Sequence, residues 1–181
     1  NPNLASTSTD NTVTYDESPT VTINQAAGQT DPTSASPILF TVTFSEPVTG
    51  FATGDVTLSG TAGATTAVVS GGPTVYAVSV SGMTTSGTVI ASINAGVAID
   101  AGSNPNLAST STDNTVTYDA SPTVTINQAA GQADPTSASP ILFTVTFSEA
   151  VTGFATGDVT LTGTAGATTA VVSAGPTVYA V

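Results

Sequence analysis

The sequence predicts an all-β protein built from tandem domains, and three observations lead to this prediction. First, residues 1–78 recur as residues 104–181, a period of 103 residues, which matches a domain rather than a solenoid repeat of about 20–50 residues. Second, the chain is rich in Thr, Val, Ser, Ala and Gly, in short alternating runs separated by Gly, Pro, Asn and Asp. Third, no segment shows the periodicity of an amphipathic helix.

One complete repeat contains seven runs typical of strands. In chain order they are Thr20–Gln25, Ile38–Ser45, Asp55–Ser59, Thr65–Ser70, Thr74–Ser81, Thr88–Asn94 and Asn114–Tyr118. Strict alternation within three of these runs predicts which side chains share an apolar face. These side chains are Val21 and Ile23 in the first run, Phe40, Val42 and Phe44 in the second, and Tyr76, Val78 and Val80 in the fifth.

Seven short strands in about 100 residues predict an immunoglobulin-like Greek-key sandwich. The chain has no Cys and no Trp, so its core must consist of Val, Ile, Leu and Phe, without the disulfide and Trp of antibody domains. We expect three parts. Residues 1–17 are the last strand of a preceding repeat, residues 18–119 are a complete domain, and residues 120–181 are an incomplete domain with the first five strands.

The two copies of the repeat differ at five positions only. The differing pairs are Glu17/Ala120, Thr30/Ala133, Pro47/Ala150, Ser59/Thr162 and Gly71/Ala174. Nearly identical tandem domains are suited to length or multivalency, whereas catalysis rarely needs the same domain twice. The repetition therefore favours a structural protein.

The side-chain inventory excludes several classes of function. The chain has no Lys, Arg or His and twelve Asp plus Glu, for a net charge of −12. Nucleic-acid binding needs Lys and Arg to neutralise phosphates, so it is excluded. Anionic membrane surfaces are disfavoured for the same reason, and no apolar run in this segment approaches the ~20 residues that span a bilayer. The usual catalytic bases and nucleophiles are also missing, so we expect no enzyme.

Strand directions predict that most carboxylates gather at one end of the complete domain. If the first strand leads away from the preceding repeat, the loops after the second and sixth strands lie at the end where the incoming linker arrives. These segments carry Asp16 and Glu17 (the linker), Glu46 and Asp55 (the loop after the second strand), and Asp100, Asn104 and Asp113 (the loop after the sixth strand). Asp31 is expected at the opposite end.

Converging carboxylates without a compensating cation repel one another, and a hard cation removes this conflict. Ca²⁺ takes about 6–8 oxygen ligands from carboxylates, amides and backbone carbonyls. We therefore expect Ca²⁺ at the junctions between domains. The candidate ligands are Asp16, Glu17, Glu46, Asp55, Asp100, Asn104, Asp119, Glu149 and Asp158. The alternative is that these acids are solvated loop residues that keep the protein soluble.

Three segments carry a resemblance to a known family: Phe44–Phe51 (FSEPVTGF), Gly54–Leu58 (GDVTL) and Ile99–Asn104 (IDAGSN). Together they resemble the bacterial Ig-like repeats of giant secreted adhesins. The resemblance implies calcium-rigidified extender domains at the cell surface, with Glu46, Asp55 and Asp100 at the acidic positions of the family. Gly102 and Ser103 depart from the family pattern. The second copy departs at Ala120 and Ala150, so its site has one carboxylate fewer.

Three functional hypotheses follow. The first is an extracellular adhesin stalk or fibre that contacts its neighbouring repeats head to tail. The second is a filament subunit joined to other copies by strand exchange, because residues 1–16 are identical to residues 104–119 and we expect them to pair as an extended strand with a neighbouring unit. The third is a glycan- or ice-binding module; repeated Thr-x-Thr, as in Thr41–Thr43, suggests ice binding, although Thr is simply a good strand former.

Overall fold

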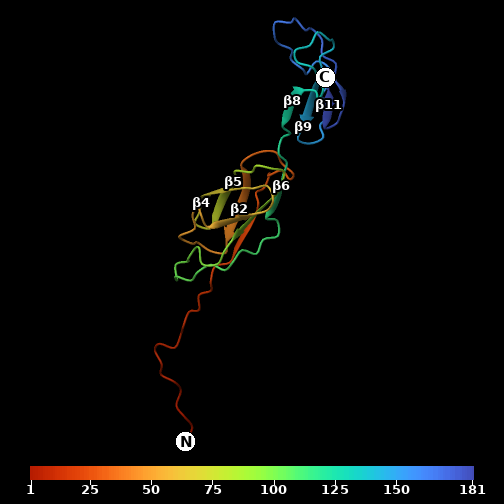
Figure 1. The fold of residues 1–181 in the computed structure, drawn as a ribbon. Coiled ribbons are helices and arrows are strands. Elements are labelled where there is room, and N and C mark those ends of the chain that lie inside the picture. Colours follow the sequence, from red (N-terminus) through yellow and green to blue (C-terminus); the bar gives the residue numbers. More distant parts are fainter. The chain divides into compact units, whose positions relative to one another are not determined.

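The computed structural model describes residues 1–181, and the chain forms two compact units, Asn1–Ala120 (unit 1) and Ser121–Val181 (unit 2). Both units contain strands and no helices (Figure 1), which confirms the predicted all-β class. The structure accordingly has no helix with the length and apolar character needed to cross a membrane.

Unit 1 contains the seven predicted strands, each starting and ending within one residue of the predicted bounds. They are β1 (Val21–Gln25), β2 (Ile38–Phe44), β3 (Val56–Ser59), β4 (Thr66–Gly71), β5 (Val75–Ser81), β6 (Gly87–Ile93) and β7 (Thr115–Tyr118). They form one sheet in the order β1-β2-β5-β4 and a second in the order β3-β6-β7, and every pairing is antiparallel.

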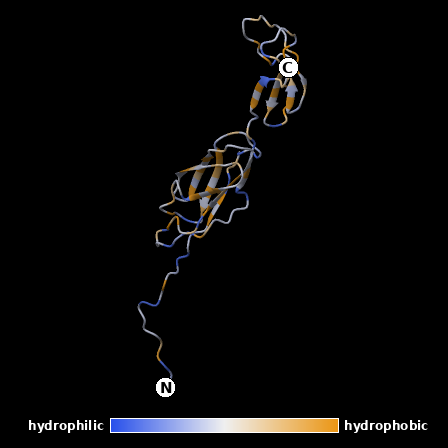
Figure 2. Cartoon of the chain, in the orientation of Figure 1, coloured by the Kyte–Doolittle hydropathy of each residue, from blue (hydrophilic) through white to orange (hydrophobic).

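The two sheets of unit 1 share one hydrophobic core, which makes the unit β-sandwich-like. Alternation along the strands places the predicted apolar faces inside this core, so that Ile23, Phe40, Val42 and Val78 are buried together with Val89 of the second sheet. Figure 2 shows hydrophobic residues along the strands of the sandwich. Alternating side chains point to opposite faces of a strand, so this pattern buries one face of each sheet and leaves the other in water.

The connection from β6 to β7 is long and is held by hydrogen bonds of both its backbone and its side chains. Its second half, residues 107–113, follows the outer edge of β1 in the same direction. The backbone N–H of Leu107 donates to the carbonyl of Pro19 (2.8 Å), and that of Gln25 donates to the carbonyl of Asp113 (2.6 Å). Asp113 therefore lies beside the far end of β1, and the prediction that it joins the other carboxylates at the linker is wrong.

Unit 2 forms a single sheet in the order β10-β11-β9-β8. Its strands are β8 (Val124–Gln128), β9 (Phe143–Phe147), β10 (Ser173–Ala174) and β11 (Val178–Ala180). The register of β8 on β9, with Val124 opposite Phe147, repeats that of β1 on β2, with Val21 opposite Phe44. Residues 159–161, which correspond to most of β3, form no strand.

Residues 1–15 are exposed along their whole length and belong to no strand. Their hydrogen bonds are local, such as that from the Ser6 hydroxyl to the Ser8 hydroxyl (3.4 Å). The expectation that they form an extended strand is therefore not met within a single chain.

Candidate metal centre

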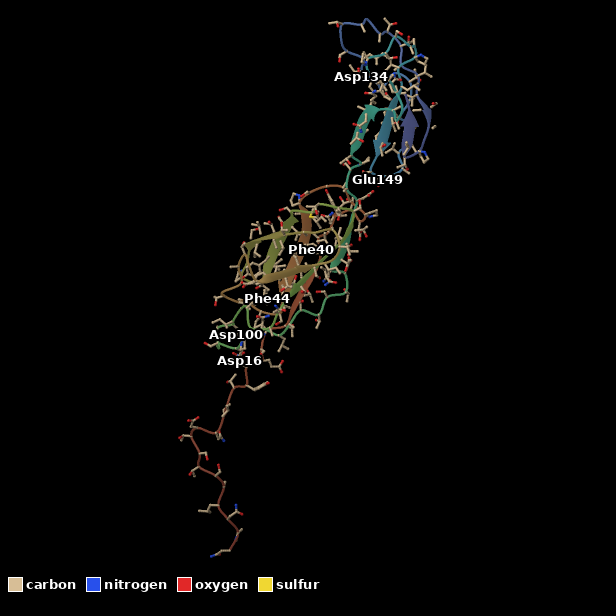
Figure 3. All side chains as sticks on the ribbon, in the orientation of Figure 1. Asp16, Phe40, Phe44, Asp100, Asp134 and Glu149 are labelled. Carbon is tan, nitrogen blue, oxygen red and sulfur yellow. The ribbon has the colours of Figure 1, made fainter.

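Three carboxylates from separate segments of unit 1 meet at one end of the sandwich. Asp16 precedes β1, Glu46 follows β2, and Asp100 lies in the connection from β6 to β7, and each offers an oxygen within 4.8 Å of the other two. Figure 3 shows Asp16 and Asp100 next to one another at this end. The topology brings them together because the loops after β2 and β6 both return to the end at which the linker arrives, as the strand directions predict.

Asp100 is held in place by a tight turn of its own loop. Only 5% of its surface is exposed, and its Oδ1 accepts a hydrogen bond from the backbone N–H of Asn104 (2.8 Å). Burial raises the pKa of Asp100, but hydrogen bonds from Asn104, Gly102 and Ser103 stabilise the charged form and bring the pKa below its ordinary value. The turn therefore keeps a buried carboxylate ionised and oriented.

The Asn104 side chain links two of the carboxylates. Its Nδ2 donates to Asp100 Oδ2 (3.0 Å) and to Asp16 Oδ2 (3.1 Å). Asp16 also lies directly against the backbone of Gly102, where any side chain would collide with its Oδ2. Glycine at this position is thus what allows the linker carboxylate to approach the turn.

Glu46 lies in the resulting concentration of negative charge. Its pKa is raised, first by partial removal from water and then by the charges of Asp100 and Asp16. Residues 1–181 contain no Lys, Arg or His, so no cationic side chain among them can neutralise the cluster. The arrangement consequently favours binding of a positive ion or a proton.

The donor atoms of this cluster suit a hard divalent cation. The three carboxylates supply oxygen ligands only, whereas the nitrogen and sulfur ligands typical of zinc are missing from the chain. A Ca–O distance of about 2.4 Å lets one Ca²⁺ bridge two oxygens that are up to about 4.8 Å apart, and each pair among the three carboxylate oxygens lies within this distance. Asp16, Glu46 and Asp100 could therefore hold one Ca²⁺, with Asn104 beside them.

Two other predicted ligands of unit 1 have different positions. The Asp55 carboxylate accepts a hydrogen bond from the backbone N–H of Ala52 (2.7 Å) and so stabilises the turn before β3. Glu17 is exposed and lies outside the three-carboxylate cluster. Asp31 lies in the loop between β1 and β2, and its carboxylate accepts the backbone N–H of Thr117 in β7 (2.9 Å).

The remaining predicted ligands, Asp119, Glu149 and Asp158, are the counterparts of Asp16, Glu46 and Asp55 one period later. Asp119 accepts a hydrogen bond from the Ser86 hydroxyl (3.3 Å), and Asp158 accepts the N–H of Ala155 (2.8 Å), as Asp55 does in unit 1. Glu149 is exposed and lies at the opposite end of unit 2 from Asp134 (Figure 3). Residues 121–181 include counterparts of Glu46 and Asp55 and none of Asp100.

Sequence reasoning missed the residue that organises the loop around the cluster. Asn106 is buried, its Oδ1 accepts the N–H groups of Val97 and Ala98 (2.9 and 2.8 Å), and its Nδ2 donates to the carbonyls of Asn94 and Leu107 (3.0 and 2.7 Å). A polar residue in an NPN motif is indistinguishable from a solvated loop residue in the sequence. Only the packed loop shows that all four hydrogen-bonding positions of this amide are used.

Comparison with known proteins gives no relative from which a role could be transferred: no protein-family model matches the chain, and no curated protein or solved structure shows significant similarity to it.

Proposed function

We propose that this chain is part of a calcium-stabilised array of immunoglobulin-like domains that forms a stiff extracellular stalk or fibre. The observation that carries the proposal is the convergence of Asp16, Glu46 and Asp100 within 4.8 Å of one another. Asp16 comes from the segment that leads into the sandwich, and the other two come from loops of the sandwich itself. An ion held by all three would fasten the linker to the domain that follows it.

Sheet topology supports the immunoglobulin-like part of the proposal. Constant-type immunoglobulin domains arrange seven strands as A-B-E-D and C-F-G. Numbered in chain order, the strands of unit 1 have this same arrangement, β1-β2-β5-β4 and β3-β6-β7. The near-identity of the second copy over residues 104–181 supports a tandem array of such domains.

Charge supports the choice of a cation as the ligand. Glu46 is partly removed from water and is repelled by Asp100 and Asp16, and both effects raise its pKa. A bound Ca²⁺ replaces the repulsion between the carboxylates with attraction to the ion. Its binding stabilises only the folded state, because the first and last of the three residues are 84 positions apart in the chain and meet only on folding. A partly exposed site of this kind fits the weaker calcium sites of extracellular modules, with dissociation constants of about 10⁻⁴–10⁻³ M.

A calcium site of this kind would stiffen the array of domains. A flexible linker allows neighbouring domains to rotate, whereas a linker carboxylate tied through an ion to two loops loses that freedom. The sequence equivalents of the linker and of the first loop residue, Asp119 and Glu149, recur one period later. The expected partners are thus neighbouring repeats, and the expected location is outside the cell, where calcium is abundant.

A pair of matched variants tests the calcium proposal. Asp16→Asn removes one charge from the cluster, while Asp10→Asn removes one charge from the exposed N-terminal segment and leaves the cluster intact. At calcium a hundredfold above Kd, the unmodified chain should gain about 2.7 kcal/mol in the free energy of unfolding. We expect Asp10→Asn to keep this gain and Asp16→Asn to lose most of it.

The measurement is calorimetric titration of Ca²⁺, which gives Kd, and thermal unfolding of each variant in chelator and in Ca²⁺ at a hundredfold above that Kd. Equal melting temperatures of the unmodified chain in both conditions would refute the proposal. So would an equal calcium response of the two variants, because Asp16 would then have no part in the site.

A further inference from the structure

The first and last segments of unit 1 lie side by side. Residues 107–113 follow β1 in the same direction, and hydrogen bonds join the two along their length. Between the bonds at the two ends of this contact, the N–H of Thr110 donates to the carbonyl of Val21 (3.1 Å), and the N–H of Ile23 donates to the Ser111 hydroxyl (3.1 Å). The contact thus combines backbone and side-chain acceptors.

A second contact of the same direction follows beyond β1. Thr33, in the loop between β1 and β2, forms a parallel bridge with the end of β7. Its N–H donates to the carbonyl of Thr117 (3.0 Å), and its carbonyl accepts the N–H of Asp119 (2.8 Å). Residues 19–33 (the incoming segment) and residues 107–119 (the outgoing segment) are therefore parallel neighbours through two successive contacts.

The shared direction of the two segments decides how their contact responds to tension. The chain enters the contact at Pro19, beside Leu107, and leaves it at Asp119, beside Thr33, so entry and exit lie at its opposite ends. A pull on the two ends of unit 1 therefore draws the two segments past one another along their own length. Hydrogen bonds between neighbouring strands lie across such a pull, so they resist it together. A pull that parted the segments from one end would break the same bonds one after another.

We propose that the incoming and outgoing segments form a mechanical clamp that keeps unit 1 folded when the array is under tension. The inference rests on the proposed function in one respect, because a stalk is what carries such tension. The hydrogen bonds of the clamp involve none of Asp16, Glu46 and Asp100, so the clamp acts with or without Ca²⁺. Separation of the two segments would uncover Ile23 and Val116, which are fully buried in the core. Rupture of the clamp is therefore the step that opens the sandwich.

The direction of pulling tests the clamp with all of its bonds in place. The chain contains no Cys, so pairs of introduced cysteines give defined attachment points for single-molecule force spectroscopy in chelator. Glu17→Cys with Ala120→Cys loads the contact from opposite ends, whereas Glu17→Cys with Ala108→Cys loads it from one end. Forced unfolding follows the rate of unfolding, and we expect the first pair to need roughly twice the force of the second or more. Equal forces in the two directions would overturn the proposal.

A matched pair of variants separates the clamp from ordinary stability. Ser111→Ala removes the hydroxyl that accepts the N–H of Ile23 in the clamp (3.1 Å), and Thr53→Ala removes a hydroxyl that accepts the N–H of Val69 in β4 (3.1 Å). Each variant loses one side-chain acceptor of a strand N–H, so the free energy of unfolding should fall by a similar amount in both. Only Ser111→Ala should also lower the unfolding force in the end-to-end direction.

An unchanged force in Ser111→Ala, or an equal loss of force in the two variants, would show that the contact carries no special load and would overturn the clamp. Because every pull is made in chelator, these outcomes do not depend on whether Ca²⁺ binds to unit 1. Failure of the clamp therefore leaves the calcium proposal standing, and failure of the calcium titration leaves the clamp standing.

Discussion

The same sequence occurs in two different environments in this chain, and the burial of its side chains differs sharply between them. Val21, Ile23 and Phe40 are 1%, 0% and 1% exposed in unit 1, whereas their counterparts Val124, Ile126 and Phe143 are 56%, 51% and 36% exposed in unit 2. All five positions at which the copies differ are exposed in unit 1, so the substitutions cannot explain the difference. Unit 2 lacks counterparts of β6 and β7, and with them the second sheet that would cover this face.

Other features are the same in both units and therefore need no second sheet. The aromatic rings of Phe44, Phe51 and Tyr76 pack edge to face, with centroids 5.0–5.9 Å apart. The counterparts in unit 2 repeat these distances. The first sheet and its aromatic cluster thus form from their own segments, whereas burial of the sheet's inner face requires a partner.

The N-terminal segment gives a second comparison of the same kind. Asn3 and Asn106 occur in identical sequences, yet Asn3 is exposed and Asn106 is buried with four hydrogen bonds. The difference again lies in the surroundings, because Asn106 is enclosed by its own loop and by the end of β6.

The largest effect should come from truncating the same isoleucine in each unit. Ile23→Ala removes fully buried methyl groups and should cost about 2–5 kcal/mol of the free energy of unfolding. Ile126→Ala removes the same groups from a half-exposed site and should cost less than about 1 kcal/mol. Denaturant unfolding and site-resolved hydrogen exchange measure both costs. Equal costs would show that the two sites are buried alike.

A smaller effect is expected from the matched asparagines. Asn106→Ala leaves the N–H groups of Val97 and Ala98 without their acceptor and should destabilise unit 1 by about 1–3 kcal/mol. Asn3→Ala makes the identical change in the exposed segment and should leave the melting temperature of unit 1 unchanged. Calorimetry measures the melting temperature of unit 1 in the two variants. A destabilisation by Asn3→Ala would contradict the exposed position of that segment.

The smallest effect concerns pH and Glu46. Partial burial and then the charges of Asp100 and Asp16 raise the pKa of Glu46 above 4.5 in the folded protein. Just above pH 4.5 the folded state therefore binds more protons than the unfolded state, and stability falls as pH rises through that window. Glu46→Gln should remove this fall, so that in chelator the variant gains stability relative to the unmodified chain between pH 4 and pH 7.

Asp100 acts in the opposite direction and in a separate window. Its pKa lies below 3.8 in the folded state, so its contribution is present above that pH and is lost as the pH falls through the folded pKa. Urea unfolding of both proteins at several pH values separates the two groups. A stability difference between Glu46→Gln and the unmodified chain that is constant from pH 4 to pH 7 would contradict the raised pKa.

Much of the fold could be predicted from residue patterns because strands are local. Alternation such as Phe40-Thr41-Val42-Thr43-Phe44, bounded by turn residues, specified both the β2 strand and its buried face. Only those features of the site that depend on strand topology could be predicted from the sequence. Strand directions brought Asp16, Glu46 and Asp100 to one end, but they could not show that Asp55 is engaged in its own turn or that Asp113 runs on along β1.

By itself, the sequence determined the all-β class, the seven strands of the repeat, the faces they bury and the absence of any cation to balance the acids, since all of these depend on residue type and local period. Tertiary structure alone decided which identical residues are buried, which carboxylates lie within reach of one ion and which asparagine holds a loop together. The physical reason is that burial and convergence are properties of neighbours distant in the chain: Ile23 and Ile126 carry the same side chain, and only the presence of a facing sheet separates a core residue from an exposed one.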